Sequence, residues 1–413
     1  MLEGALARAC EEALARRQVP GAAIGVLAGE GTWTAGFGVL DARSREPVAA
    51  DSSFRIASVT KPFTATLALH ASLSGAIGFD EEAPGPVAGV TVRHLLSHLG
   101  GFEGECGDLA RFGDGDDALA RLVAELDRQP VVVPPGELWS YCNAGYWLLA
   151  HTLAERLGTT FEQALHERVL HPLRLERTGF DAPDATGHDR GQPVADGYPR
   201  ARNASGGLVS TVGDLLAFAR FHVEERDAAA LRVPVAATPS GWYGFGLALE
   251  RVGDLGLWGH EGDYGGFRSR LVFAPEARFA FAGLTNAATG RAALEDVLDV
   301  ALSEALGVRR EPPPTTPRPA AELRRLAGRY ARAELELDVR AADGGLELDA
   351  VEIDRVTGAR TRHAGLTARA LGRRLYVLEG GEWDGARFDF HPQRGVPRFV
   401  RMGSRLTPRS DRG

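Results

Sequence analysis

Residues 53–63, Ser-Phe-Arg-Ile-Ala-Ser-Val-Thr-Lys-Pro-Phe, decide the fold of this chain. The first five residues of the stretch read as a strand, and residues 61–74 read as a helix with apolar side chains at helical spacing. Pro62 falls in the first turn of that helix, where its missing N–H costs nothing, and Gly75 supplies a stop. The stretch is therefore a strand-to-helix junction with Ser58 at the opening of the helix.

Ser58 and Lys61 stand three residues apart at this junction, so they share one face of the helix. The start of a helix carries free N–H groups and partial positive charge. Lys61 is the only lysine among the 47 basic residues; the others are arginines, which keep their proton near neutral pH. The alternative is an accidental serine beside a surface lysine. The pattern favours a serine nucleophile that uses an amine as its proton acceptor.

The composition is typical of a soluble globular protein, with 413 residues, 44% hydrophobic and 25% charged. That length exceeds one ordinary core, so we expect two domains. The net charge of −8 argues against nonspecific binding of nucleic acid. We expect no membrane span and no signal peptide, because no run of 18 apolar residues occurs and the first helix lacks an apolar core.

Cysteine and histidine spacing indicate no metal site, and we expect no cofactor. The three cysteines, Cys10, Cys106 and Cys142, are odd in number and lack metal-site spacing, which favours a reduced cytoplasm. His94 and His98 are four residues apart, a spacing that can hold zinc, but no third ligand accompanies them. We therefore expect packing and helix capping from these histidines. The oligomeric state is left open by the sequence.

Strand patterns occur at both ends of the first 306 residues, and helical patterns fill the middle. Strands are expected at 22–27, 32–37, 243–249, 266–273 and 279–286, and residues 203–207 form a turn into another. Helices are expected at 1–17, 61–74, 91–98, 117–127, 144–157, 212–223 and 291–306. The order predicts an α/β fold in which an antiparallel sheet, assembled from both ends of the chain, is flanked by helices and carries a helical subdomain.

A stiff, proline-rich segment at 311–319 separates this region from a different pattern. Beyond it, apolar residues alternate with charges in many short strands joined by glycine turns, as in Leu335, Leu337 and Val339. We expect a small antiparallel β-barrel over 320–413, after a first domain that spans 1–310.

Two further motifs follow Ser58 along the chain. Tyr141-x-Asn143 comes after the stiff loop at 134–136 and opens the helix at 144–157, where Asn143 is expected as the N-cap. His260-x-Gly262 lies in a stretch with four glycines, which lets the backbone approach a ligand or another strand closely. In purely structural terms, Tyr141 would be a half-buried aromatic residue.

Taken in order, Ser58-x-x-Lys61, Tyr141-x-Asn143 and His260-x-Gly262 resemble the motifs of the serine β-lactamase and penicillin-binding-protein superfamily. The resemblance points to the class C β-lactamase-like branch, with its D-aminopeptidase, esterase and thioesterase relatives. It covers residues 1–306. Within that range, the stretches 54–58, 94–98 and 206–208 also look like the corresponding stretches of the family. The C-terminal barrel is similar to the lipocalin-like domain found in some of these relatives.

The resemblance implies an acyl-enzyme mechanism without a cofactor. Ser58 would attack a carbonyl, Lys61 would take or relay its proton, and Tyr141 would act as base toward Ser58 and as acid toward the leaving group. The N–H groups of Ser58 and Asp263 would form the oxyanion hole. The residues expected to bind the substrate are Asn143, His260, which would lie on an edge strand, Gly262 and Asp263.

The third motif departs from the usual Lys-Thr-Gly of β-lactamases. Neutral His260 is a poorer anchor for a carboxylate, and Glu261 adds like charge, so efficient β-lactamase activity is not expected. His-x-Gly is similar to D-aminopeptidase-like enzymes, to some esterases and to thioesterases that cyclise nonribosomal peptides.

We therefore expect a serine hydrolase or acyltransferase that acts on a small-molecule or peptide substrate, including esters and peptides with D-residues. The alternatives are a peptide-cyclising thioesterase, a β-lactamase, and a non-catalytic binding protein on the same scaffold.

Overall fold

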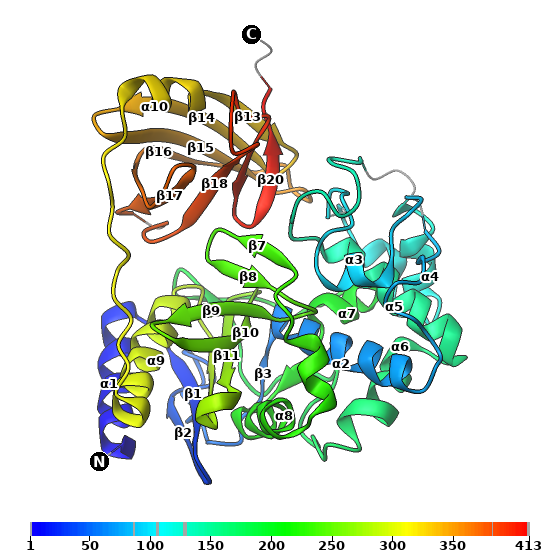
Figure 1. The fold of residues 1–413 in the computed structure, drawn as a ribbon. Helices are drawn as coiled ribbons and strands as arrows, with labels where there is room; N and C mark the ends of the chain where they lie inside the picture. The colour runs from blue at the N-terminus through cyan, green and yellow to red at the C-terminus, as the bar shows by residue number, and fades with distance from the viewer. Residues whose placement is uncertain (1, 86, 105–106, 127–129, 382, 411–413) are drawn as a thin grey trace.

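The computed structural model describes residues 2–85, 87–104, 107–126, 130–381 and 383–410. Two eight-stranded antiparallel sheets dominate it, one in the first three quarters of the chain and one near the C-terminus (Figure 1). Within the described residues, no helix is both long and apolar enough to span a bilayer.

The first sheet has the strand order β2-β1-β12-β11-β10-β9-β8-β7. Its strands are β1 (Gly21–Ala28), β2 (Gly31–Gly38), β7 (Ala236–Thr238), β8 (Gly241–Tyr243), β9 (Ala248–Val252), β10 (Leu255–Tyr264), β11 (Phe267–Ala274) and β12 (Phe279–Thr285). β1 pairs with β12 in the register Ile24 to Gly283, so the sheet is assembled from both ends of this region, as predicted. The single strand expected at 243–249 is divided into β8 and β9 by a turn at 244–247.

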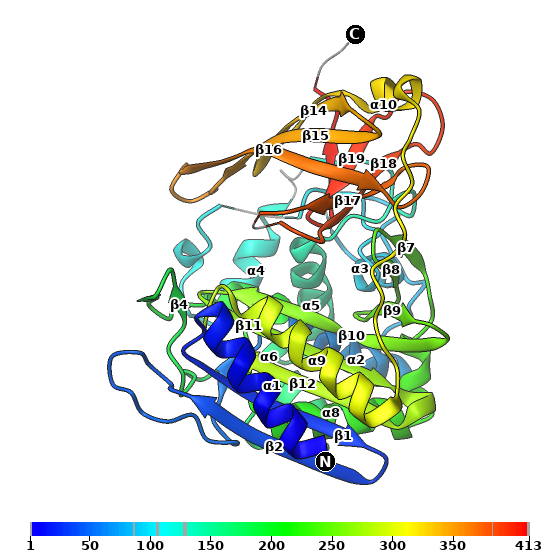
Figure 2. The ribbon, with the colours of Figure 1, turned by 90° about the vertical axis from the view of Figure 1, so that its left-hand side faces the viewer.

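Helices cover both faces of this sheet. α1 (Leu2–Arg17) and α9 (Gly290–Leu306) pack on one face, and α2 (Thr60–Leu73) and α8 (Val212–Glu224) pack on the other (Figure 2). Successive strand residues point to opposite faces of the sheet. Ile24 therefore packs with α1 and α9, whereas Ala23 packs in the core that contains α2 and α8. Burial on both faces explains why β1 and β12 are almost continuously apolar.

The helical subdomain lies beside α2 and consists of short elements. They are α3 (Val92–Leu96), α4 (Ala118–Val123), α5 (Asn143–Leu157), α6 (Phe161–Leu165) and α7 (Asn203–Gly206). The helix expected at 117–127 is shorter in the structure, and residue 127 lies outside the described residues. Residues 203–206, expected as a turn, form the one-turn helix α7. Two small strand pairs complete this region: β3 (Phe54–Arg55) with β6 (Val209–Ser210), and β4 (His188–Asp189) with β5 (Gln192–Pro193).

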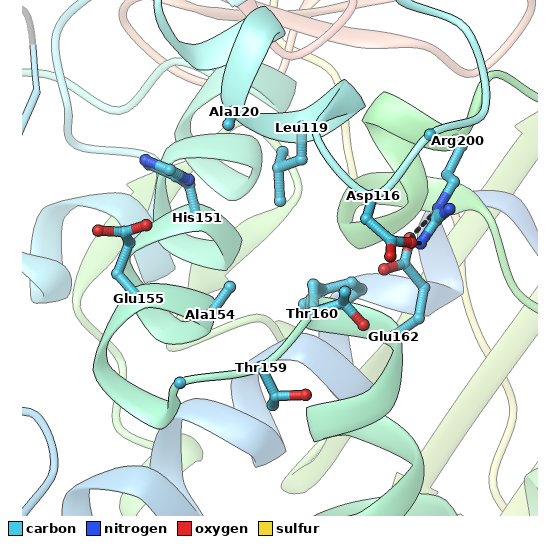
Figure 3. Close-up of a pocket in the computed structure, with 13 residues that line it drawn as sticks. Asp116, Leu119, Ala120, His151, Ala154, Glu155, Thr159, Thr160, Glu162 and Arg200 are labelled. Carbon is cyan, nitrogen blue, oxygen red and sulfur yellow. Dashed lines mark hydrogen bonds and ion pairs between the residues drawn. The ribbon is translucent and has the colours of Figure 1, made fainter.

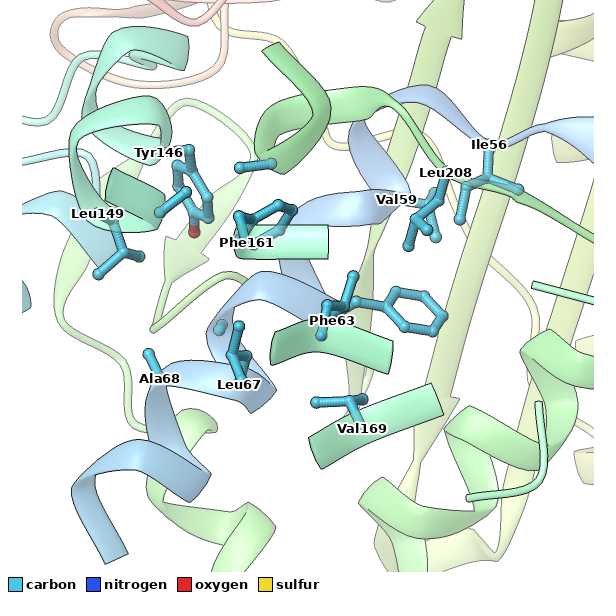
Figure 4. Close-up of a cluster of buried hydrophobic side chains, with 14 of the residues drawn as sticks. Ile56, Val59, Phe63, Leu67, Ala68, Tyr146, Leu149, Phe161, Val169 and Leu208 are labelled. Atoms are coloured by element: carbon cyan, nitrogen blue, oxygen red, sulfur yellow. The ribbon is translucent and has the colours of Figure 1, made fainter. Parts of the chain in front are cut away.

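α2 runs through the main hydrophobic core, with 11 of its 14 residues buried. Figure 4 shows Phe63 and Leu67 of α2 among side chains from α5, α6 and the segment before α2. The ring of Phe63 stacks on Phe218 of α8 with centroids 3.8 Å apart. This packing fixes the helix that carries Lys61.

The second sheet curls into a nearly closed barrel. Its strands follow chain order as β13 (Gly328–Arg332), β14 (Leu335–Ala342), β15 (Gly345–Ile353), β16 (Arg360–Ala370), β17 (Leu375–Glu379), β18 (Arg387–His391), β19 (Phe399–Met402) and β20 (Arg405–Pro408). A bridge between Tyr330 and Arg409 brings the first and last strands together, and α10 (Ala320–Leu326) packs against the barrel core.

Residues 311–319 carry no helix or strand, and the main chain of Thr316 and Arg318 already bonds to the barrel. On this basis we propose a division into residues 1–310, a linker at 311–319 and residues 320–413.

Removing the ring of Phe63 tests this core. Phe63→Ala should lower the free energy of unfolding by about 3–5 kcal/mol, because a fully buried aromatic ring is replaced by a cavity. Urea unfolding followed by circular dichroism measures the change, and Phe63→Leu, which keeps most of the volume, should cost less. A loss below about 1 kcal/mol for Phe63→Ala would contradict the assigned packing.

Candidate active site

Ser58 lies in a short 3₁₀ turn, Ala57–Val59, that precedes α2, so it does not open the α-helix itself. Ala57 has a φ of 44°, in the left-handed region that non-glycine residues rarely adopt. This strained turn presents Ser58 half-buried beside the first turn of α2. The predicted pairing with Lys61 is present, because Lys61 Nζ donates to Ser58 Oγ at 3.1 Å.

The side chain of Lys61 is fully buried, which is rare for a lysine. Its Nζ also donates to the carbonyl oxygen of Ser205 in α7 at 2.7 Å. The same nitrogen lies 4.7 Å from the ring centroid of Tyr141 and 5.5 Å from that of Tyr146, both within cation–π range. The structure thus brings Ser58, Lys61 and Tyr141 together around one amine.

Tyr141 belongs to an extended segment just before α5, and its main chain is bonded outside the helical subdomain. Its N–H donates to the carbonyl of Ser404 in the C-terminal barrel at 2.8 Å. The guanidinium carbon of Arg405, the next barrel residue, lies 5.4 Å from the Tyr141 ring centroid. Sequence reasoning missed Arg405, because no motif marks it and arginine is common throughout the chain.

His98 supports this segment from the other side. It is fully buried with a left-handed φ of 58°. Its Nδ1 accepts from the N–H of Cys142 at 3.1 Å, so the neutral ring carries its proton on Nε2, which donates to the Tyr243 hydroxyl at 3.2 Å. Burial, followed by the charge of Lys61, holds the pKa of His98 well below its ordinary value. His98 is therefore a neutral structural residue, as predicted.

His94 is occupied in the same structural way. Its ring Nδ1 accepts from the backbone N–H of Thr91, and the backbone N–H of His94 donates to the Thr91 hydroxyl. These two bonds form a capping box at the start of α3. Across the described part of the chain, no group of three metal-ligating side chains comes together. Cys10 and Cys142 are buried thiols without a disulfide, and Cys106 lies outside the described residues.

Asn143 is not the N-cap of α5. That position belongs to Cys142, whose Sγ accepts from the N–H of Gly145 at 3.3 Å. Asn143 is instead the first helical residue and is 7% exposed. The displacement by one residue arises because Cys142 adopts the extended conformation that a cap requires.

The third motif lies on β10, but His260 is not on a simple edge strand. β10 pairs with β9 from Leu255 to Gly259 and with β11 from Trp258 to Tyr264. His260 is therefore the first residue beyond the β9 pairing, where a strand of the sheet's interior becomes an edge. His260 was expected on an edge strand, and it does lie where β9 no longer pairs with β10, although residues 255–259 of the same strand lie inside the sheet.

His260 is buried and neutral. Its Nδ1 donates to the Glu261 carbonyl at 2.6 Å, which leaves Nε2 as an acceptor. Burial, then the charges of Lys61 and Arg270, hold the pKa of His260 well below its ordinary value. Its ring centroid lies 6.0 Å from that of Tyr141.

Gly262 is required by close packing. A Cβ at this position would lie 2.1 Å from the carbonyl oxygen of Ile56, two residues before Ser58. The Ser269 hydroxyl also donates to that carbonyl, at 2.7 Å. Without a side chain at Gly262, β10 can lie directly against the turn that carries Ser58.

Glu261 and Asp263 point to the other face of β10. Glu261 forms ion pairs with Arg270 and Arg291, and Asp263 forms one with Arg268. The like charge expected from Glu261 is therefore neutralised on the far face, because side chains alternate along a strand. An exposed Asp263 side chain leaves only its main-chain N–H for the expected oxyanion role.

A separate cavity of about 290 Å³ lies between α4, α5 and α6 (Figure 3). On one side of it, Arg200 forms ion pairs with Asp116 at 2.7 Å and Glu162 at 3.4 Å. Glu162 also accepts from the side chain of Asn203 in α7, the helix whose Ser205 carbonyl binds Lys61. This cavity is lined by none of the expected site residues.

Comparison with known proteins agrees with this geometry. A family profile described as beta-lactamase matches residues 6–305. Penicillin-binding protein 4 of Amycolatopsis lactamdurans is 30% identical over 359 residues, which cover 76% of this chain and 93% of that protein.

This chain belongs to the beta-lactamase family.

Other similarities include the C-terminal barrel as well as the residues that the family profile matches. The D-aminopeptidase of Gluconobacter oxydans is 30% identical over 369 residues, which cover 81% of this chain and 67% of that protein. The crystal structure of a protein named SurE is 27% identical, with a TM-score of 0.80 over 99% of both chains. The family consists of serine hydrolases with this α/β fold, so the predictions of fold, family and enzyme class are confirmed.

Replacing the only lysine tests its chemical role. Lys61→Arg keeps the charge but cannot release a proton near neutral pH, so kcat/KM for p-nitrophenyl butyrate should fall by at least about 100-fold, as for loss of a general base. The control is Lys61→Cys alkylated to aminoethylcysteine in a chain whose native cysteines are replaced, which restores an amine and should recover part of the activity. If Lys61→Arg kept more than about a tenth of the native activity, Lys61 would not transfer a proton during the reaction.

Buried neutral histidines predict acid sensitivity. Burial lowers the pKa values of His98, His222 and His260, that of His222 to about 3. The unfolded chain binds protons at these residues near pH 6.5 and the folded chain does not, so stability should fall as pH drops below about 6.5. The slope should approach about 1.4 kcal/mol per pH unit for each histidine. Urea unfolding at pH 7.5, 6.5 and 5.5 measures it, and constant stability over this range would contradict the assignment.

Proposed function

We propose that this protein is a serine hydrolase or acyltransferase that forms an acyl-enzyme on Ser58 with peptide or ester substrates. One observation carries the proposal: Lys61 Nζ lies 3.1 Å from Ser58 Oγ and 4.7 Å from the Tyr141 ring centroid. A hydroxyl, an amine and a phenol gathered in this way can activate the nucleophile and return its proton to a leaving group.

Charge around Tyr141 supports its role as the base. The Tyr141 ring has Lys61 Nζ at 4.7 Å and the Arg405 guanidinium at 5.4 Å from its centroid. Positive charge near a phenol favours the phenolate, which can accept the Ser58 proton directly or through Lys61. As the Ser58 Oγ–carbon bond forms, the carbonyl electron pair moves to oxygen. When the intermediate collapses, Tyr141 returns the proton to the departing amine or alcohol.

β10 offers a way to hold a peptide substrate. Among the described residues, β9 pairs with β10 only as far as Gly259, so residues 260–264 have β11 on one side. An extended peptide can pair with such an edge through its main chain. At the same place, His260 presents an acceptor nitrogen, and Gly262 keeps β10 close to the nucleophile turn. We propose that His260 and Asn143 contact the substrate and that the Ser58 and Asp263 N–H groups stabilise the oxyanion.

The proposed substrates include peptides with D-residues. Two comparisons support this class: one relative is named D-aminopeptidase, and a second crystal structure of SurE contains D-Leu. SurE also matches this chain through the C-terminal barrel. Acyl transfer to an amine within the same peptide, which would cyclise it, requires only that an amine replace water at the acyl-enzyme.

A substrate panel tests the proposal. D-alanine p-nitroanilide should react at least about 10-fold faster than its L-isomer, a ratio within the range that pocket shape supplies. A cephalosporin should react more slowly than p-nitrophenyl butyrate, because neutral His260 replaces the usual lysine.

Intact mass should show one adduct after fluorophosphonate treatment, and none in Ser58→Ala. An adduct that persists in Ser58→Ala would refute the nucleophile. Equal rates for the two alanine isomers would refute the preference for D-residues. With a peptidyl thioester, mass spectrometry separates the cyclic product, which is lighter by one water, from the linear acid.

A further inference from the structure

The three residues 139–141 are each bonded to the β19–β20 hairpin of the barrel. The Arg401 guanidinium donates to the Trp139 carbonyl at 3.2 Å, and the N–H of Leu406 donates to the Ser140 hydroxyl at 3.2 Å. The Tyr141 N–H donates to the Ser404 carbonyl at 2.8 Å. The segment that presents the Tyr141 phenol is therefore bonded to the barrel at every residue.

Arg401 is the rigid member of this set. It is 2% exposed and binds Asp389 through two hydrogen bonds of 2.9 and 2.6 Å. His391 holds the same carboxylate at 3.1 Å. A forked pair of this kind fixes the plane of the guanidinium. The remaining Nη1 then reaches two carbonyls of the catalytic region, Trp139 at 3.2 Å and Ala237 at 3.1 Å.

His98 holds the opposite side of the same segment. Its carbonyl accepts from the N–H of Ser140 at 3.1 Å, and its Nδ1 accepts from the N–H of Cys142 at 3.1 Å. Residues 139–142 are thus held between His98 and the barrel. Removal of Arg401 would leave the two hydrogen bonds to His98 in place. It would break the bond from the guanidinium to the Trp139 carbonyl, two residues before Tyr141.

We propose that Arg401 is a positioning residue for Tyr141, so that the barrel aligns the base of the catalytic region. This inference rests on the proposed function of Tyr141. Arg401 acts through the main chain of Trp139 and does not touch the reacting atoms. Its loss should slow the chemical step by displacing the phenol from Lys61, and it should leave the binding of a small ester nearly unchanged.

The test compares variants by their kinetics with p-nitrophenyl butyrate between pH 5 and 9. Arg401→Met should lower kcat by about 30-fold with less than a threefold change in KM. Arg401→Lys keeps the positive charge but cannot form the two parallel bonds to Asp389. Its kcat should lie between that of Arg401→Met and that of the native protein. The matched control is Arg340→Met, which removes a barrel arginine that pairs with Glu347 and Asp349 of the barrel and should leave kcat unchanged.

The pH profile distinguishes positioning from a loss of folded protein. A phenol moved away from Lys61 forms its phenolate less readily, so the acidic limb of kcat/KM should shift to higher pH in Arg401→Met. Partial unfolding would lower the amplitude without moving the limb. Titration with a fluorophosphonate corrects kcat for the fraction of competent sites.

Ser140→Ala and Tyr141→Phe complete the test. Ser140→Ala removes the bond to Leu406 and leaves Arg401 and Asp389 intact, so it applies even if Arg401→Met fails to fold. It should lower kcat by about threefold to tenfold and shift the same limb.

Native kcat and an unshifted limb in a folded Arg401→Met would overturn the positioning role of Arg401, and the same result in Ser140→Ala would overturn alignment of this segment by the barrel. Tyr141→Phe separates this outcome from failure of the proposed function. If Tyr141→Phe keeps native activity, Tyr141 is not the base. If it is inactive while the other variants are native, only the inference about Arg401 fails.

Discussion

The buried amino group of Lys61 is the constraint around which the first domain is arranged. Burying such a polar group in a protein is costly unless hydrogen-bond partners surround it. Here the partners come from three parts of the chain: the hydroxyl of Ser58, the carbonyl of Ser205, and the ring faces of Tyr141 and Tyr146. Each element that contacts this nitrogen is thereby brought close to Ser58, so the structural requirement of a buried lysine also assembles the proposed active site.

Close packing of the main chain supplies the second requirement. β10 approaches the turn at Ala57–Val59 so closely that a Cβ at Gly262 would collide with the carbonyl of Ile56. Alternation along β10 then separates two roles. His260 faces Tyr141, whereas Glu261 forms ion pairs on the far face. One strand can therefore present a neutral, buried acceptor to the site and still carry charges that hold the outer surface together.

The barrel joins the catalytic region at the segment that carries Tyr141. A buried pair of Arg401 and Asp389 lies at this junction, and breaking such a pair is costly because it leaves one charge uncompensated. The apolar contact beside it includes Val133 of the catalytic region with Phe399 and Leu406 of the barrel. The two parts of the chain are thus connected by directional bonds at the site as well as by the proline-rich segment.

Local patterns in the sequence determined much of this protein: the helix after Ser58, the pairing of Ser58 with Lys61, the two-ended sheet and the strands of the barrel. The helix, the Ser58–Lys61 spacing and the barrel strands rest on periodicity or on spacing within one turn, which neighbouring residues fix, and the two-ended sheet follows from strand patterns at both ends of the region. Only the tertiary structure decided that Cys142 caps α5, that β9 ends before His260, and that Arg401 and Arg405 lie beside residues 139–141. The Arg401–Trp139 bond joins residues 262 apart in the chain, and the Cys142 main chain is held by His98, 44 residues before it; no local pattern encodes such contacts.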